Sequence, residues 1–180
     1  MHNSKMVLLV IDTQKLIMNN QLYNFALFTQ NIAKLISAAR ENNVEVIYVR
    51  HDDGVGEALT KGKKGFEIAD DFTPLPAEKI FDKTVNSAFK ESGLLEYLIE
   101  KGIEKVIITG LQTDYCIDAS VKCAFEHGFE VIIPANANTT EDNSYMSGEK
   151  TYRYYNEMMW DGRYGKCEPL EDVIALMKEE

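Results

Sequence analysis

Continuous apolar runs alternate along this chain with segments whose apolar residues recur every three or four positions. The runs are typical of β-strands that are covered on both faces, and the spacing of three or four is typical of amphipathic helices. We predict strands at residues 6–11, 44–49, 79–81, 105–110 and 129–133, and the third of these has the weakest pattern.

The predicted helices lie between and after these strands. Glycines at positions 102 and 128 would end the second and third helices, because glycine readily adopts the conformation that follows a helix. The segment from Asp52 to Pro76 holds four glycines without a clear period and is predicted to be mostly loop. We predict helices at residues 24–42, 94–99 and 117–127, and a last helix with Pro169 in its first turn.

The alternation of buried strands and amphipathic helices predicts an α/β fold. Fully apolar strands indicate a doubly wound, mainly parallel sheet with helices on both faces, as in Rossmann-like folds. The length of 180 residues, without repeats or linkers, predicts a single domain over residues 1–180. Such sheets bind ligands outside the carboxyl ends of their strands, so polar residues at those ends are the candidates for function.

Residues that can take part in chemistry follow four of the predicted strands. Asp12 comes after the first strand, His51 follows the second, Lys83 lies just past the third, and Cys116 follows the fourth. Because parallel strands end at the same edge of a sheet, we expect these side chains to converge there. An acid, a cation and a thiol at one edge form a plausible catalytic group.

A thiol attacks only as its thiolate, so Cys116 would need a proton acceptor and stabilising charges. Asp12 could accept the thiol proton and later deliver it to a leaving amine. Lys83 could stabilise both negative charges and hold the triad in its ionised form. The start of the following helix would be a smaller aid to the thiolate, and backbone N–H groups around Gln112 and Cys116 could bind an oxyanion.

Each of these residues also has an ordinary structural explanation. A cysteine at such a position can be a buried packing residue, and Cys123 on the same helix is interpreted in that way. An aspartate at a strand end can be a turn or cap residue, and a lysine in a polar segment can be a solvated charge. The convergence of all three residue types at one edge favours the catalytic interpretation.

Composition narrows the classes of partner. The formal net charge of −10 argues against binding to nucleic acid or to an anionic membrane surface. No apolar run approaches the roughly 20 residues that cross a bilayer, and the first residues lack the pattern of a signal peptide. The three cysteines suggest neither a disulfide framework nor a metal-binding pair, so we expect a cytoplasmic protein with a small-molecule substrate.

The segment from Gly110 to Ile117 resembles the nucleophile segment of the isochorismatase-like cysteine hydrolases, which include nicotinamidases and N-carbamoylsarcosine amidohydrolases. Ile11 to Gln14 resembles the Asp-x-Gln signature of that family's first strand, and Gly65 to Phe89 resembles the segment with its catalytic lysine. The resemblance runs from about residue 6 to the C-terminus. Three motifs in the same order make it specific to this superfamily.

The resemblance implies a doubly wound, mainly parallel sheet of six strands, with the sixth near Tyr164 to Cys167. It also implies that Asp12, Lys83 and Cys116 form an Asp-Lys-Cys catalytic triad. The five strands and the edge residues described above fit these implications, and the sixth strand has only a poor local signal in the sequence.

The same resemblance carries expectations about the pocket and the assembly. It implies a cis peptide bond before Gln112, no cofactor, and a homo-oligomer, either a dimer or a tetramer. We expect Gln14, Gln112 and Tyr115 to bind the substrate. Residues of a neighbouring subunit would help to close the pocket.

Two features depart from the family. Nicotinamidases of this group often bind a metal through an Asp-x-His motif and a further histidine after the second strand. Here that region has His51 without a second histidine nearby, so we predict no metal and interpret His51 as a hydrogen-bonding or solvated residue. The segment Lys15 to Ile17 lacks an aromatic residue that many relatives have, so the pocket shape and the substrate are not carried over.

The predicted function is that of a cysteine hydrolase that cleaves a C–N bond of a small amide or carbamoyl compound through a thioester on Cys116. Three alternatives stay open. An isochorismatase-type enzyme would cleave a vinyl ether with Asp12 as the acid and would not need the cysteine. An inactive binding member of the same fold, or a phospho-accepting signalling module, would use the strand ends without hydrolysis.

Overall fold

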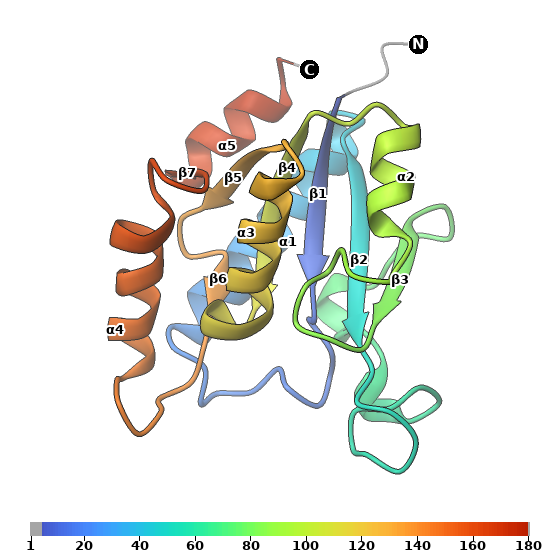
Figure 1. Ribbon diagram of the computed structural model, residues 1–180, viewed down its shortest axis with the longest axis vertical. Helices are drawn as coiled ribbons and strands as arrows, with labels where there is room; N and C mark the ends of the chain where they lie inside the picture. The colour runs from blue at the N-terminus through green and yellow to red at the C-terminus, as the bar shows by residue number, and fades with distance from the viewer. Residues whose placement is uncertain (1–4, 180) are drawn as a thin grey trace.

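A parallel β-sheet runs through the middle of the structure, a computed structural model that describes residues 5–179 (Figure 1). Neighbouring strands pair in parallel throughout, which confirms the predicted α/β fold. Across the sheet the strands are β3 (Lys79–Lys83), β2 (Glu45–His51), β1 (Met6–Ile11), β4 (Lys105–Leu111), β5 (Glu130–Pro134) and β7 (Lys166–Glu168), and β6 (Asn138–Thr139) pairs with the end of β4.

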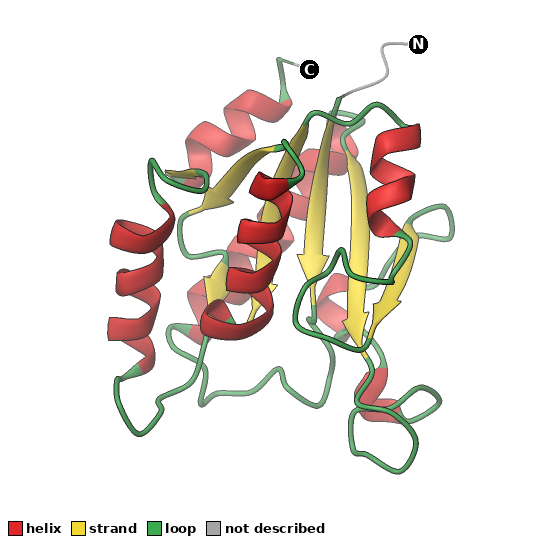
Figure 2. Cartoon of the chain, in the orientation of Figure 1, coloured by secondary structure: helices red, strands yellow, loops and turns green. Residues whose placement is uncertain are grey.

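Helices cover both faces of the sheet (Figure 2). One hydrophobic core joins the sheet to α1 and α5, and a second core joins its other face to α2 and α3. The helices are α1 (Phe25–Glu41), α2 (Leu94–Glu100), α3 (Asp118–Glu126), α4 (Gly148–Arg153) and α5 (Leu170–Met177). The short turns are two 3-10 turns, Lys64–Phe66 and Asp70–Phe72, and two π-helical turns, Thr113–Ile117 and Tyr154–Trp160.

Strand β1 explains why the strands read as continuous apolar runs. Side chains alternate along a strand, so Val7 and Leu9 enter the core with α2 and α3, while Leu8 and Val10 enter the core with α1 and α5. All six residues of β1 are buried. A strand that is covered on both faces leaves no position for a solvated polar residue, so polar chemistry begins only where the strand ends, at Asp12.

The elements differ from the sequence-based expectations in a few places. Cys116 lies inside a π-helical turn that precedes α3, and Lys83 is the last residue of β3 and not a residue beyond it. The family resemblance implies a sixth strand near residues 164–167, and β7, at residues 166–168, is that strand. The short strand β6 pairs with β4 and is additional to these six. Within residues 5–179, no helix has the length and the apolar composition to cross a membrane.

The close approach of β1 and β4 requires a glycine. Gly110 pairs with Ile11 in the sheet and has a φ angle of +124°. A Cβ atom built on Gly110 would lie 1.9 Å from the backbone oxygen of Ile11, far inside van der Waals contact. The two strand ends that lead to Asp12 and Cys116 can therefore lie side by side only with glycine at this position.

Gly110→Ala is expected to lower the free energy of unfolding by about 3 kcal/mol or more, because the added methyl group forces β1 and β4 apart. Urea unfolding followed by circular dichroism measures the loss. Gly102→Ala is the matched control, because Gly102 also has a positive φ, +67°, but its Cβ would meet no atom within 4 Å. That variant should lose only about 1 kcal/mol, and equal losses in the two variants would contradict the steric account.

Candidate active site

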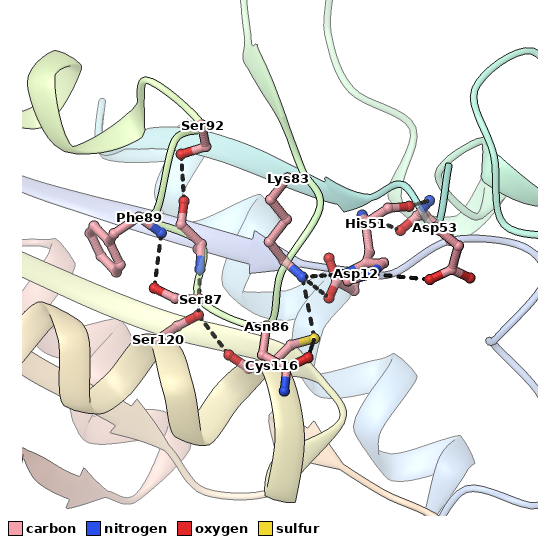
Figure 3. A network of polar contacts seen from close by, with 12 residues as sticks. Asp12, His51, Asp53, Lys83, Asn86, Ser87, Phe89, Ser92, Cys116 and Ser120 are labelled. Carbon is pink, nitrogen blue, oxygen red and sulfur yellow. Dashed lines mark hydrogen bonds and ion pairs between the residues drawn. The ribbon is translucent and has the colours of Figure 1, made fainter. Parts of the chain in front are cut away.

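The ends of β1, β3 and β4 bring together the three residues of the predicted triad (Figure 3). Asp12 follows β1 with a left-handed backbone, φ 55°, and its N–H donates to the Val49 carbonyl at 2.8 Å. Lys83 ends β3, and Cys116 lies in the π-helical turn after β4. A left-handed conformation costs a residue with a Cβ atom about 1 kcal/mol, so the surrounding sheet must hold Asp12 in place.

The Lys83 ammonium lies at the centre of the site. Its Nζ atom is 2.7 Å from Asp12 Oδ2, 3.2 Å from Cys116 Sγ and 2.9 Å from His51 Nδ1. The side chain of Lys83 is 0% exposed and that of Asp12 is 2% exposed. An ammonium has three N–H donors, and its close partners here match them in number: an ion pair with Asp12 and hydrogen bonds to Cys116 and His51. The buried charge is thus paired and hydrogen-bonded, which is the condition for keeping a charge inside a protein.

Burial acts in the same direction on the two acidic members of the triad. Loss of water raises the pKa of the Asp12 carboxyl, and the Lys83 ammonium opposes this rise. Burial, together with the charge of Asp12, raises the pKa of the Cys116 thiol to about 12, again against the effect of Lys83. Both changes favour the protonated forms, so burial holds the Cys116 proton on sulfur and makes Asp12 a stronger base than an aspartate in water. Burial therefore opposes the ionised form of the triad that the sequence analysis expects, while the Lys83 charge favours it.

Buried polar side chains hold the turn that carries Cys116. The Thr113 hydroxyl donates to Asn138 Oδ1 at 2.8 Å. Asn138 also exchanges two hydrogen bonds with Asn156, at 2.9 and 3.1 Å. All three of these polar residues are buried, so β6, which lies against the end of β4, fixes the start of the turn that carries Cys116. Sequence reasoning missed this network, and the polar residues after the fifth strand were its local signal.

The Gln14 side chain does not line the pocket over the thiol. Its Nε2 atom donates to the carbonyl oxygens of His51 and Phe66 at 3.0 and 3.1 Å, and its Oε1 atom accepts from the His51 N–H at 2.8 Å. Gln14 is fully buried, so both of its N–H donors are used within the protein. This placement disagrees with the predicted substrate contact: the side chain connects the end of β2 to residue 66 and to the chain after β1.

A cavity of about 250 Å³ opens beside Cys116. Gln112 and Tyr115, two of the predicted substrate-binding residues, lie in its wall, and the Leu111–Gln112 peptide bond is cis, as the family resemblance implies. Asn86, which sequence reasoning missed, is also in the wall, and its Oδ1 atom is 3.9 Å from Cys116 Sγ. The remaining lining residues are Asp12, Ile17, His51, Leu59 and Leu111.

Three potential metal ligands lie close together in this site. Ligand atoms of Asp12, His51 and Cys116 are all within 4.8 Å of one another. The Lys83 ammonium, however, is within 3.2 Å of each of the same three side chains, so a metal ion placed among them would stand against a buried positive charge. These residues therefore do not fit a metal ion while Lys83 is in place.

The isochorismatase domain model matches residues 6–153, which include Asp12, Lys83 and Cys116. The chain belongs to the isochorismatase family. It is accordingly a hydrolase of that family, and the sequence-based identification is confirmed.

Individual relatives agree with this assignment. An uncharacterised isochorismatase family protein of Bacillus subtilis (strain 168), YrdC, is 32% identical over 136 residues, which cover 74% of this chain and 73% of that protein. Nicotinamidase 3 of Arabidopsis thaliana is 29% identical over 154 residues, which cover 77% of this chain and 75% of that protein.

Solved structures share the fold. A cysteine hydrolase from Pseudomonas syringae pv. phaseolicola 1448A superposes with a TM-score of 0.89 at 22% identity, over 97% of this chain and 93% of its own. N-carbamoylsarcosine amidase from Thermoplasma acidophilum superposes with a TM-score of 0.77 at 19% identity, over 93% of this chain and 98% of its own. The fold of the isochorismatase family members is therefore the fold of this chain.

Replacing Asp12 and replacing Lys83 should lower the free energy of unfolding by different amounts. Asp12→Asn leaves a buried ammonium without its carboxylate and is expected to lower the free energy of unfolding by about 3–5 kcal/mol. Lys83→Met leaves a buried carboxyl group that can become neutral by binding a proton, so the loss in the free energy of unfolding should be smaller. Urea unfolding of both variants at pH 5 and pH 8 measures the difference.

The pH dependence of the Lys83→Met variant follows from linkage. Without the ammonium, the folded-state pKa of Asp12 rises further above its ordinary value of 3.8, so the folded protein holds a proton that the unfolded chain releases. The stability of this variant is therefore highest below that ordinary value and falls as the pH rises through the folded-state pKa. Lys61→Met, which removes an exposed partner of Asp82, is the control and should cost at most about 1 kcal/mol. A Lys83→Met variant that becomes more stable between pH 5 and pH 8 would contradict the account.

Proposed function

We propose that this hydrolase cleaves a C–N bond of a small amide or carbamoyl compound through a thioester on Cys116. The observation that carries the proposal is the position of the Lys83 ammonium, in contact with both the Asp12 carboxylate and the Cys116 sulfur beside the cavity. Two similar proteins, a nicotinamidase and an N-carbamoylsarcosine amidase, have names that describe the cleavage of C–N bonds of this kind. Asp12, Lys83 and Cys116 are thus proposed as the catalytic residues.

In the first half of the reaction Asp12 takes the proton of the Cys116 thiol while the sulfur attacks the carbonyl carbon. The raised pKa of the carboxyl makes this transfer easier than it would be for an aspartate in water. Lys83 stabilises the negative charge on whichever of the two groups carries it, because its Nζ atom contacts both. Asp12 then gives the proton to the leaving nitrogen, and the C–N bond breaks to release ammonia or an amine.

In the second half water replaces the amine. Asp12, again a carboxylate, takes a proton from the attacking water, and the thioester bond breaks to give the acid and the sulfur of Cys116. The proton on Asp12 returns to the thiolate, so the resting site is restored. Backbone N–H groups of Gln112 and Cys116, both in the cavity wall, are proposed to stabilise the oxyanion of both tetrahedral intermediates.

The chemistry of the cavity wall favours an uncharged amide over the substrate of the vinyl ether alternative. Isochorismate carries carboxylates, which proteins commonly recognise with arginine or lysine. None of the described residues that line the cavity is an arginine or a lysine, and the nearby Lys83 has all of its donors engaged. Ile17, Leu59 and Leu111 supply apolar wall, while the Asn86 side chain offers one neutral polar group. The expected absence of a cofactor, the homo-oligomer and the cytoplasmic location stay predictions.

Cys116→Ala is expected to abolish ammonia release from a panel of small amides that includes nicotinamide, with a loss of at least about 10³-fold, because no other group can form the thioester. A coupled assay for ammonia measures it. Cys123→Ala is the control, because Cys123 packs against the core on α3 and should leave the activity unchanged. Ammonia release by Cys116→Ala at the wild-type rate would refute the thioester mechanism and favour a role for Asp12 alone.

The activity should fall on the acid side of its pH profile. Asp12 must be a carboxylate to accept the thiol proton, and its pKa is raised above 3.8 by burial. Protonation of Asp12 therefore stops the reaction as the pH decreases, with a midpoint above 3.8 in kcat/KM. Steady-state kinetics from about pH 4 to pH 9 on the best amide of the panel test this, and a flat profile down to pH 4 would rule out Asp12 as the base.

A further inference from the structure

We propose that His51 is a positioning residue that fixes the Lys83 ammonium in its orientation toward Cys116, and that Asp53 holds the histidine in the tautomer that this role requires. The proposal rests on the proposed function of the triad and adds to it an outer chain of two residues. His51 and Asp53 act through Lys83 and are not assigned any contact with the reacting atoms.

The tautomer of His51 follows from the chemistry of its neighbours. Lys83 can only donate hydrogen bonds, so the His51 Nδ1 atom, 2.9 Å from Lys83 Nζ, must accept with a lone pair. The ring is then neutral and carries its proton on Nε2. Nε2 lies 3.1 Å from Asp53 Oδ1, a carboxylate oxygen that accepts this proton's hydrogen bond. The hydrogen bonds therefore run in one direction, from the Lys83 ammonium to His51 Nδ1 and from His51 Nε2 to the Asp53 carboxylate (Figure 3).

The backbone of His51 is fixed on both sides. It is the last residue of β2 and pairs with Lys83 in the parallel register of the sheet, so the two side chains leave neighbouring strands at the same level. Its N–H and C=O groups are both bonded to the side chain of Gln14. The ring is 15% exposed, which leaves Nδ1 facing the ammonium and Nε2 facing Asp53 at the surface. A solvated histidine at a strand end would not have hydrogen bonds to both of its backbone groups and partners at both ring nitrogens.

The third acceptor determines where the ammonium points. Asp12 and Cys116 take two of the three N–H donors of Lys83, and His51 takes the third. Without His51 one buried donor has no partner, and the ammonium can turn or shift to regain one. The Asp12 carboxylate beside the ammonium has a second buried oxygen, Oδ1, without a hydrogen-bond partner among the described residues, so a Lys83 that loses His51 has an acceptor toward which it can turn. A shift away from the sulfur weakens the stabilisation of the developing thiolate.

The reactivity of Cys116 toward iodoacetamide tests the proposal without knowledge of the substrate. Alkylation consumes the thiolate, so its rate at Cys116, measured by peptide mass spectrometry at pH 8, reports how well Lys83 stabilises that charge. His51→Leu fills a similar volume without an acceptor and should slow alkylation of Cys116 about tenfold. His51→Asn restores a neutral acceptor close to the position of Nδ1 and should recover most of the wild-type rate. Asp53→Ala should have an intermediate effect.

Internal controls separate positioning from general damage to the fold. Alkylation of Cys123 and Cys167 should be unchanged in every variant, and Glu57→Ala, in the exposed part of the same loop, should behave as the wild type throughout. Urea unfolding identifies a variant that is merely less stable. On the best amide of the panel, His51→Leu should lower kcat about 10²-fold while KM changes by less than about threefold, since the lysine contributes to the charge that forms in the reaction.

Two results would overturn the proposal: wild-type alkylation of Cys116 in His51→Leu, or equal slowing in His51→Leu and His51→Asn. The second result would mean that the acceptor is irrelevant and that only the ring shape matters. Failure of the proposed function has a different signature, namely hydrolysis by Cys116→Ala, which is measured on its own. The positioning of Lys83 by His51 is thus judged by the alkylation rates even if the thioester mechanism fails.

Discussion

Lys83 carries a positive charge on a side chain that is closed to solvent, and the ends of three other strands supply what that charge requires. Asp12 after β1 supplies the opposite charge, His51 at the end of β2 supplies a lone pair, and Cys116 after β4 supplies the third contact. An isolated buried ammonium would be highly unfavourable, so the lysine constrains each of these partners. The same constraint joins the proposed base, Asp12, and the proposed nucleophile, Cys116, because Lys83 contacts both and stabilises a negative charge on either of them.

Residues next to the site hold these strand ends in position. Gly110 lets β1 and β4 approach closely enough for Asp12 and the turn that carries Cys116 to meet. The Gln14 side chain is hydrogen-bonded to the backbone N–H and C=O groups of His51. The buried hydrogen bond between Thr113 and Asn138 holds the turn that carries Cys116. Each of these contacts joins segments distant in the chain, so the precision of the site comes from the sheet and not from local loop conformation.

The sequence predicted most of the strands and helices and the convergence of Asp12, Lys83 and Cys116, but it did not predict α4, β6 or the residues around the candidate site. Strands such as β1 that are buried on both faces produce clear apolar runs, whereas the partly exposed β3 has a weak one. The rule that parallel strands end at one edge then brings Asp12, Lys83 and Cys116 together without coordinates. Asn86 has no periodic or compositional signal, since its place beside the sulfur depends on the path of the chain after β3. Gln14 was misjudged because a polar side chain near a catalytic residue can face inward as easily as outward, and only the three-dimensional neighbours decide which. The charge state of the thiol depends on the three-dimensional structure for a related reason, because a sequence pattern identifies the charged residues but not the depth at which they are buried.

The most direct test of this account is the mass of the protein during turnover. Intact-mass spectrometry of acid-quenched samples, followed by peptide mapping, should show a fraction of the protein heavier by the acyl group of the amide, with the amine absent and the added mass on the peptide of Cys116. Asp12 and Lys83 have value in this account only as partners of that covalent step. Continued turnover with no adduct at any quench time, under conditions in which hydroxylamine also fails to trap an acyl group, would contradict the account, as would an adduct on any residue other than Cys116.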